Sequence, residues 1–185
     1  MKNKIREEMK QKRRNMVPEE VFEKSKQAQK IFMQSEQYKK AESVMAYIPL
    51  GNEADTSVII SDAFKKGKNV SVPITDAETY EISAYKITED TEFKKGTFSV
   101  LEPKERVCLD KNNIDVVLVP GIAFDRCGGR VGFGKGCYDK FLKDINAIKI
   151  GFCYDFQLLE HINTDSTDVT MDFIITEKEI IRGKL

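Results

Sequence analysis

The sequence predicts an α/β fold, with a mostly parallel (mixed) sheet flanked by helices in three layers, as in Rossmann-like open sheets. Two observations predict it. The first 73 residues alternate between helical periodicity and short apolar runs, in the order helix, helix, strand, helix, strand, which favours parallel neighbours. Later, residues 115–119 form an apolar run that ends at Pro120, as buried parallel strands do. A length of 185 residues favours a single domain, residues 1–185, with a substantial core.

The first half of the chain supplies most of the expected helices. A helix over residues 2–16 is indicated by Ile5 and Met9, which recur on one side. Pro18 suits the first turn of a second helix, which ends near Ser35. The other elements of this half are a strand over residues 43–48, a helix that begins at the N-cap residues 55–57 and stops at Gly67, and a strand over residues 69–73.

The second half is expected to add strands on both sides of a glycine-rich segment. Residues 80–87 alternate between apolar and polar side chains, which predicts a strand near an edge of the sheet. The polar residues 88–113 are expected to form loop and short extended pieces. The strand at residues 115–119 leads into the glycine-rich segment. After it we expect a helix over residues 136–143 and strands over residues 147–154 and 172–175.

Composition excludes several classes of function. Thirty basic and 30 acidic residues give a net charge of zero, which argues against a nucleic-acid-binding role. No apolar run approaches the roughly 20 residues that span a bilayer, and the charged residues 1–14 do not resemble a signal peptide. Four cysteines without a Cys-x-x-Cys pair, and a single histidine, argue against structural zinc. We expect a cytoplasmic monomer with reduced thiols and no nucleic-acid or membrane partner.

The glycine-rich segment is the strongest functional signal. Six of the chain's 11 glycines fall between Gly121 and Gly136. Glycine loses the most conformational freedom on folding, so this density indicates a loop whose backbone approaches something closely. The charges of Arg126, Arg130 and Lys135 indicate an anion, and backbone N–H groups in such turns bind phosphate. A purely structural turn is the alternative, but ordinary strand-to-helix connections are shorter.

Two common phosphate-binding motifs fail on this loop. The dinucleotide fingerprint G-x-G-x-x-G needs a glycine at position 137, where the chain has Cys137. The P-loop pattern needs a hydroxyl after Lys135, and the residue there is Gly136. Asp139 offers a different oxygen ligand for Mg²⁺, which commonly takes one or two carboxylates together with phosphates and water.

The N-terminal helix carries basic side chains at a spacing of four, namely Lys2, Arg6 and Lys10. They form either a solvated face or a ladder of cations for phosphates. A nucleophilic triad would have to use His161, which fits a packed or surface histidine better. Phosphoryl transfer needs positioning and positive charge more than a nucleophile, and the chain offers those groups.

A long motif resembles the signature of a known family. Residues 120–125 read Pro-Gly-Ile-Ala-Phe-Asp, and residues 129–139 read Gly-Arg-Val-Gly-Phe-Gly-Lys-Gly-Cys-Tyr-Asp. Together they are similar to the pattern P-G-x-A/G-F-D followed by R-L/V/M-G-x-G-x-G-Y-Y-D, found in the 5-formyltetrahydrofolate cyclo-ligase (methenyltetrahydrofolate synthetase) family. Phe133 occupies a variable position of that pattern. Cys137 stands where the pattern has its first tyrosine, so any contact from that tyrosine is lost.

The resemblance runs through nearly the whole chain. Lys2 and Arg6 match an N-terminal K-x-x-x-R, residues 47–56 resemble the folate-side segment, and residues 171–172 match a late acidic position. Such a resemblance implies an ATP- and Mg²⁺-dependent reaction. Phosphoryl transfer activates the formyl oxygen of 5-formyltetrahydrofolate, nitrogen 10 closes the ring, and the products are 5,10-methenyltetrahydrofolate, ADP and phosphate.

The resemblance also implies roles for individual residues, with Lys135 and Arg130 as the catalytic ones. Nucleotide-binding residues would be Lys2, Asn3, Lys4, Ile5, Arg6, Arg130, Val131, Gly132, Phe133, Gly134, Lys135, Gly136, Cys137 and Tyr138. Folate-binding residues would be Ile48, Glu53, Phe133, Gly134, Lys135, Gly136 and Cys137. Asp139 and Asp172 would hold Mg²⁺. Taken alone, Glu53 also fits a charged first-turn residue, and Asp172 fits the polar start of a strand.

Two other functions remain open from the sequence. One is a P-loop-like small-molecule kinase, against which the missing hydroxyl at Gly136 counts. The other is a non-catalytic nucleotide- or RNA-binding module that uses the basic N-terminal helix. Zero net charge and the lack of interleaved aromatic residues in that helix count against this module.

Overall fold

The structure, a computed structural model, describes residues 2–183. Its α-helices are α1 (Lys2–Arg14), α2 (Pro18–Gln34), α3 (Glu36–Lys40), α4 (Ser57–Lys65) and α5 (Cys137–Leu142). The strands are β1 (Ser43–Met45), β2 (Asn69–Thr75), β3 (Ile82–Ile87), β4 (Phe93–Lys95), β5 (Leu101–Pro103), β6 (Val107–Leu109), β7 (Val116–Val119), β8 (Ala123–Asp125), β9 (Arg130–Val131), β10 (Ile148–Phe152), β11 (Leu158–Leu159), β12 (Phe173–Ile175) and β13 (Ile180–Arg182). Single 3₁₀ turns are η1 (Thr97–Ser99), η2 (Lys111–Asn113) and η3 (Asp155–Gln157).

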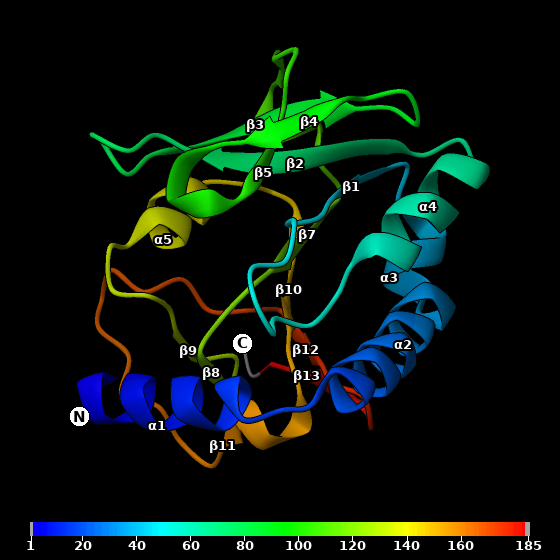
Figure 1. Cartoon of the computed structure of the whole chain (residues 1–185). Helices are drawn as coiled ribbons and strands as arrows, with labels where there is room; N and C mark the ends of the chain where they lie inside the picture. The colour runs from blue at the N-terminus through cyan, green and yellow to red at the C-terminus, as the bar shows by residue number, and fades with distance from the viewer. Residues whose placement is uncertain (1, 184–185) are drawn as a thin grey trace.

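An eight-stranded mixed sheet forms the centre of the fold, in the order β13-β12-β10-β7-β1-β2-β3-β6 (Figure 1). The five strands from β12 to β2 run parallel to one another. At one end β13 pairs antiparallel with β12. At the other end β3 pairs antiparallel with β2, and the edge strand β6 pairs antiparallel with β3. The register places Val44 beside Val116, and Val116 beside Ile148. The predicted α/β fold with a mostly parallel sheet is confirmed.

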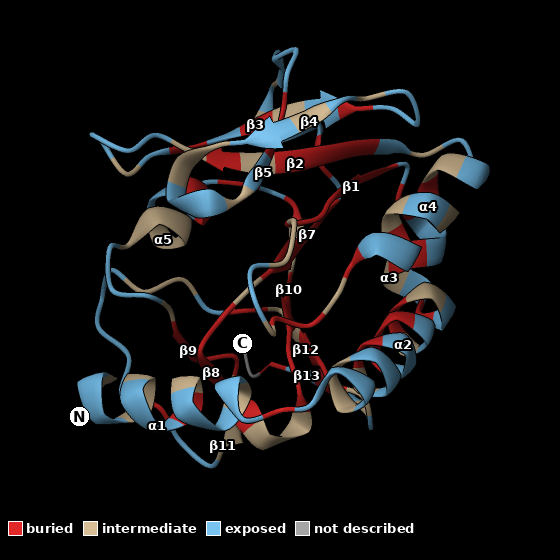
Figure 2. Ribbon diagram, viewed as in Figure 1, coloured by how far each residue is buried: buried red, intermediate tan, exposed pale blue. Residues whose placement is uncertain are grey.

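Helices cover the two faces of the sheet, which gives three layers (Figures 1 and 2). On one face, Phe32, Tyr38 and Ile59 from α2, α3 and α4 pack on Val116 and Leu118 of β7. On the other face, Phe141 and Leu142 of α5 belong to the cluster that contains Val117 and Val119. Alternate side chains of β7 therefore enter opposite cores, and all four are buried.

A small sheet, in the order β11-β8-β9, carries the N-terminal helix. Met9 of α1 is buried in a third apolar cluster with Ile122, Ala123, Val131 and Ile162. This cluster fixes α1 beside the segment that follows β7, although the two are more than 100 residues apart in the sequence. Within residues 2–183, none of the helices combines the length and the apolarity that crossing a bilayer requires.

Several elements differ from the sequence-based expectation. Ser35 ends α2 and caps the unpredicted helix α3, because its hydroxyl accepts a hydrogen bond from Tyr38 N at 3.2 Å. The strand expected over residues 43–48 ends at Met45. β11 and β13 were not expected, since each is only two or three residues long. The loop expected after Pro120 contains two short strands, β8 and β9.

Candidate functional site

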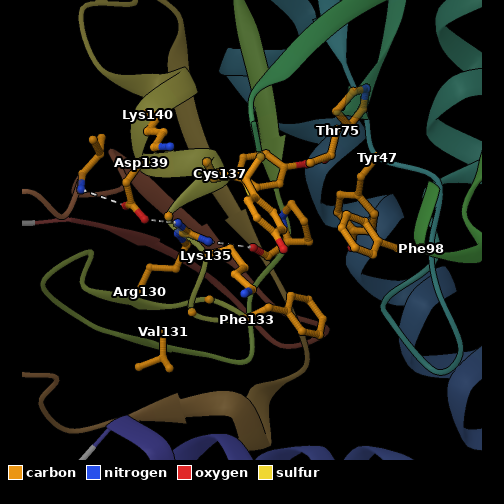
Figure 3. Close-up of a pocket in the computed structure, with 18 of the residues that line it drawn as sticks. Tyr47, Thr75, Phe98, Arg130, Val131, Phe133, Lys135, Cys137, Asp139 and Lys140 are labelled. Atoms are coloured by element: carbon orange, nitrogen blue, oxygen red, sulfur yellow. Dashed lines mark hydrogen bonds and ion pairs between the residues drawn. The ribbon is translucent and has the colours of Figure 1, made fainter. Parts of the chain in front are cut away.

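A cleft of about 940 Å³ opens beyond the carboxyl ends of β1, β2 and β7. Ligands of open α/β sheets bind at such ends, and this volume suits a small-molecule site. Figure 3 shows Arg130, Lys135 and Asp139 on one side of the cleft and Tyr47, Thr75 and Phe98 on the other. The lining comes from α1, residues 47–53, the end of β2, Tyr80, residues 97–102, Pro120, residues 130–143 and residues 165–169.

Asp125 shapes the hairpin that presents Arg130 to the cleft. Its buried carboxylate accepts backbone hydrogen bonds from Cys127 at 2.9 Å, from Gly129 at 2.8 Å and from Ile162 at 2.8 Å. A side chain on Gly129 would place its Cβ 2.8 Å from Asp125 Oδ2. The first half of the sequence motif is therefore structural, because it builds the turn between β8 and β9.

Arg130 has a buried guanidinium in which two of the three nitrogens contact protein oxygens. Its Nη2 donates to Asp139 Oδ2 at 2.9 Å, and its Nη1 lies 3.4 Å from the carbonyl oxygen of Pro120. Its Nε has no hydrogen-bond partner within the described part of the chain. A Cβ on Gly132 would lie 2.8 Å from Nη1. Gly132 therefore makes room for the protein's own arginine, whereas the sequence suggested that these glycines make room for a ligand.

Lys135 lies at the tip of the loop between Gly134 and Gly136, whose φ angles are +103° and +68°. Its ammonium sits 4.7 Å from the centre of the Tyr80 ring, in a cation–π contact. Tyr80 in turn stacks on Phe98, with ring centroids 6.3 Å apart. The exposed lysine is thus held by an aromatic face, which leaves its N–H donors available to a ligand.

Glu53 is a buried carboxylate on the floor of the cleft. Its Oε2 accepts a hydrogen bond from Leu50 N at 3.0 Å, and Oε1 lies 3.6 Å from Arg13 Nη1. Burial raises the pKa of Glu53, although Leu50 N–H and Arg13 oppose the shift. Burial, and then the charge of Glu53, also raise the pKa of Tyr138. The site therefore combines a buried carboxylate with cations and neutral phenols.

The two aspartates expected to hold Mg²⁺ are placed differently. Asp139 lines the cleft and accepts hydrogen bonds from Arg130 and from Val169 N. Asp172 is not among the lining residues; its Oδ2 accepts a hydrogen bond from Lys149 N at 2.7 Å, just before β12. No group of three or more histidine, cysteine or acidic side chains suited to a metal is found in residues 2–183.

Most of the other predicted site residues line the same cleft. These are Lys2, Arg6, Ile48, Glu53, Arg130, Val131, Gly132, Phe133, Gly134, Lys135, Gly136, Cys137 and Tyr138. Asn3, Lys4 and Ile5 do not. Instead, Asn3 Oδ1 accepts a hydrogen bond from Arg6 at 2.6 Å, and Ile5 packs on the cluster around Met9.

Sequence reasoning missed two parts of the lining. Tyr80 and Phe98 come from segments read as a strand start and a polar loop, and both have left-handed backbones with φ of +58° and +54°. An isolated aromatic residue in a polar segment was the available signal for Phe98. Residues 165–169 form the other missed wall, and nothing but their polar character marked them.

Comparison with protein-family models matches residues 1–177 to the 5-formyltetrahydrofolate cyclo-ligase family. The chain belongs to this family. Among cyclo-ligases, the Mus musculus enzyme is 26% identical over 186 residues, covering 94% of this chain and 92% of the relative. The enzyme of Escherichia coli strain K12 is 26% identical over 178 residues, covering 93% and 98%.

A solved structure supports the same grouping. The NMR structure of Aquifex aeolicus 5,10-methenyltetrahydrofolate synthetase superposes with a TM-score of 0.87 at 32% identity, covering 98% of this chain and 92% of that one. The cyclo-ligase fold thus extends over nearly the whole chain. The motif that resembled the cyclo-ligase signature forms one wall of the cleft and the hairpin behind it.

Proposed function

We infer that this chain converts 5-formyltetrahydrofolate to 5,10-methenyltetrahydrofolate with ATP, releasing ADP and phosphate. Membership of the cyclo-ligase family supports the reaction. One observation supports where the reaction takes place: Lys2 and Arg6 of α1, residues 47–53 of the expected folate-side segment, and residues 130–139 all line one cleft. ATP and the folate can react only if the segments that bind them line the same cleft, because their reacting groups must come into contact.

We propose that the ATP phosphates lie against Lys135, Arg130, Lys2 and Arg6. All four side chains line the cleft. Arg130 Nε is a buried donor that has no hydrogen-bond partner among residues 2–183. The Lys135 ammonium lies over the ring of Tyr80. Phosphoryl transfer is catalysed mainly by positioning and by positive charge near the transferred group, so Lys135 and Arg130 are assigned the catalytic roles.

We propose that Asp139 is the protein ligand of Mg²⁺. It is the one of the two predicted aspartates that lines the cleft, and a single carboxylate with phosphate oxygens and water suits this ion. Arg130 and Val169 N–H fix the Asp139 carboxylate in place. When bound, Mg²⁺ would neutralise phosphate charge. Asp172, the second predicted ligand, lies outside the cleft lining, where its Oδ2 accepts a hydrogen bond from Lys149 N and lies 3.4 Å from the Lys149 ammonium.

We propose that the folate lies between Ile48, Glu53 and the aromatic pair Tyr80 and Phe98. Glu53 would accept hydrogen bonds from the donors of the pterin ring, and the two rings would cover its face. In the reaction, the formyl oxygen takes the γ-phosphoryl group from ATP. Nitrogen 10 then bonds to the formyl carbon and loses its proton to solvent, and the carbon–oxygen bond breaks as phosphate leaves.

The test is to incubate the protein with 5-formyltetrahydrofolate, ATP and Mg²⁺ and to follow methenyltetrahydrofolate by its near-ultraviolet absorbance. Product should require ATP and should appear with one ADP per turnover. A folded, ATP-binding protein that makes no product would refute the proposal. ADP formed with a phosphorylated small molecule, and without the methenyl product, would instead support the kinase alternative.

We further propose a cytoplasmic monomer whose partners are these two small molecules, with no nucleic-acid or membrane partner. The zero net charge of the chain supports the absence of a nucleic-acid partner. Light scattering after size exclusion should give a mass near 21.1 kDa. A mass of twice that value would contradict the monomer.

A further inference from the structure

A turn at residues 165–168 holds the ammonium of Lys2 at the edge of the cleft. Lys2 Nζ donates to Asp165 Oδ2 at 2.7 Å and to Asp168 Oδ2 at 2.6 Å. All three side chains line the cleft. The Asp168 side chain is 20% exposed, against 76% for Asp165. Solvent screens an exposed charge more strongly, so Asp168 is the stronger partner of Lys2.

Asp168 is itself fixed by the turn. Its Oδ2 also accepts a hydrogen bond from Asp165 N at 2.8 Å, and its own N–H donates to Asp165 O at 3.0 Å. The next residue, Val169, donates its N–H to Asp139 Oδ1 at 3.1 Å. The turn thus connects the start of α1 with Asp139 of α5, and both of these line the cleft.

The contact leaves the lysine able to bind an anion. A lysine ammonium has three N–H donors, and the two carboxylates occupy two of them. Hydrogen bonds to Asp165 and Asp168 also raise the pKa of Lys2, which keeps it charged. Holding a long, flexible side chain in place before binding removes part of the entropy cost that a ligand would otherwise have to overcome.

We propose that Asp168 is a positioning residue for the nucleotide, which holds Lys2 where its free donor meets the phosphates, with Asp165 as the minor partner. The proposal rests on the proposed function in taking the anion to be ATP. The competing effect is repulsion, because two carboxylates beside a triphosphate would weaken its binding. Positioning and repulsion predict opposite changes in ATP affinity when the Asp168 charge is removed.

The test is Asp168→Asn, which keeps the shape of the side chain and an oxygen for Asp165 N but removes the negative charge. Calorimetry with a non-hydrolysable ATP analogue gives Kd, and turnover gives KM for ATP and kcat. We expect Kd and KM for ATP to rise about fivefold, the order of one partly exposed ion pair, with kcat nearly unchanged. Asp168→Glu should recover most of the affinity. Asp165→Asn, which removes the charge of the more exposed and minor partner, should change Kd by less than about twofold.

A double-mutant cycle shows whether Asp168 acts through Lys2. In a Lys2→Met background, Asp168→Asn should have no further effect on Kd. The proposal is overturned if Asp168→Asn leaves Kd unchanged or lowers it. It is also overturned if Asp168→Asn raises Kd as much in the Lys2→Met background as in wild type. If the wild-type protein binds the analogue but forms no methenyltetrahydrofolate, the proposed reaction fails, while the binding data still decide the role of Asp168.

Discussion

Some side chains at the site are placed to act on a ligand, and others hold those side chains in position. The contacts of each residue show which of the two roles it has. Asp125 binds backbone N–H groups of the hairpin, and Gly132 leaves room for the guanidinium of Arg130, so both fix the place of Arg130. Lys135 has the opposite character, because it is exposed and rests on the Tyr80 ring. Substitutions at Lys135 should therefore affect turnover, whereas substitutions at Asp125 or Gly132 should affect folding as well.

Lys135→Ala should lower kcat by on the order of a hundredfold, the usual cost of removing one group that stabilises transition-state charge. Because the side chain is exposed, the free energy of unfolding should change by less than about 0.5 kcal/mol. Steady-state turnover and urea unfolding give the two quantities. Lys65→Ala, on the exposed side of α4, is the matched control and should leave both unchanged. Loss of the folded state in Lys135→Ala would make the loop structural at this residue.

Glu53 should make stability depend on pH. Burial raises its folded-state pKa above the ordinary value of 4.5. The folded state therefore binds this proton more tightly than the unfolded state, and the associated stability is lost as pH rises through the folded-state pKa. Glu53→Gln should melt higher than wild type at pH 7, and the difference should shrink toward pH 4. If the melting temperatures of Glu53→Gln and wild type differ by the same amount at every pH from 4 to 7, the raised pKa of Glu53 is contradicted.

At the scale of elements, α1 supplies the cations Lys2 and Arg6 to the cleft. It packs beside the small sheet β11-β8-β9 and not on the main sheet. It is attached through Met9 in the cluster with Val131 and Ile162, and through a hydrogen bond from Arg6 Nε to Gly132 O at 2.8 Å. This attachment lies next to the cleft and combines the apolar packing of Met9 with polar contacts from Arg6. Loosening it should therefore change nucleotide binding more than the chemical step.

Met9→Ala should raise KM for ATP several-fold, because removing a buried methionine costs about 2–5 kcal/mol of packing and frees the start of α1. Turnover at saturating ATP should fall much less. Arg14→Ala, at the exposed end of the same helix, serves as the control. An unchanged KM for ATP in Met9→Ala would mean that α1 is held by its polar contacts alone.

The sequence predicts the long elements well and the short ones poorly. Helices α1 and α2 and strand β7 carry enough periodic or apolar residues to be recognised. Strands such as β11 and β13 owe their existence to neighbours far along the chain, which local patterns do not show. The same holds for the site, since residues 130–139 carry a motif, while Asp168 gains its role only from contact with Lys2, 166 residues away.

For the whole molecule, the cleft joins segments from all parts of the sequence. Its lining runs from Lys2 to Val169, so a bound ligand ties together the N-terminal helix, the β4–β5 hairpin and the glycine-rich loop. A ligand that binds only the folded state stabilises it as a unit. We therefore expect one cooperative transition for the chain, consistent with the single domain predicted from its length.

An ATP analogue at about 100 times its Kd should stabilise the fold by about 2.7 kcal/mol, which is a rise of about 5–10 °C in Tm for a chain of this size. Circular dichroism and tyrosine fluorescence should give the same midpoint with and without the ligand. The chain has six tyrosines and no tryptophan, so the fluorescence reports several regions. Two separate midpoints would show that the parts unfold independently.

The ring of Phe124 fills space that two glycines leave open. A Cβ at Gly121 would lie 2.5 Å from Phe124 Cζ, and one at Gly151 would lie 2.5 Å from Phe124 Cε1. These three positions belong to different segments, yet a larger residue at either glycine needs a smaller one at position 124. A change at either glycine is therefore expected to be tolerated only together with a smaller residue at position 124, which is a constraint of packing and not of catalysis.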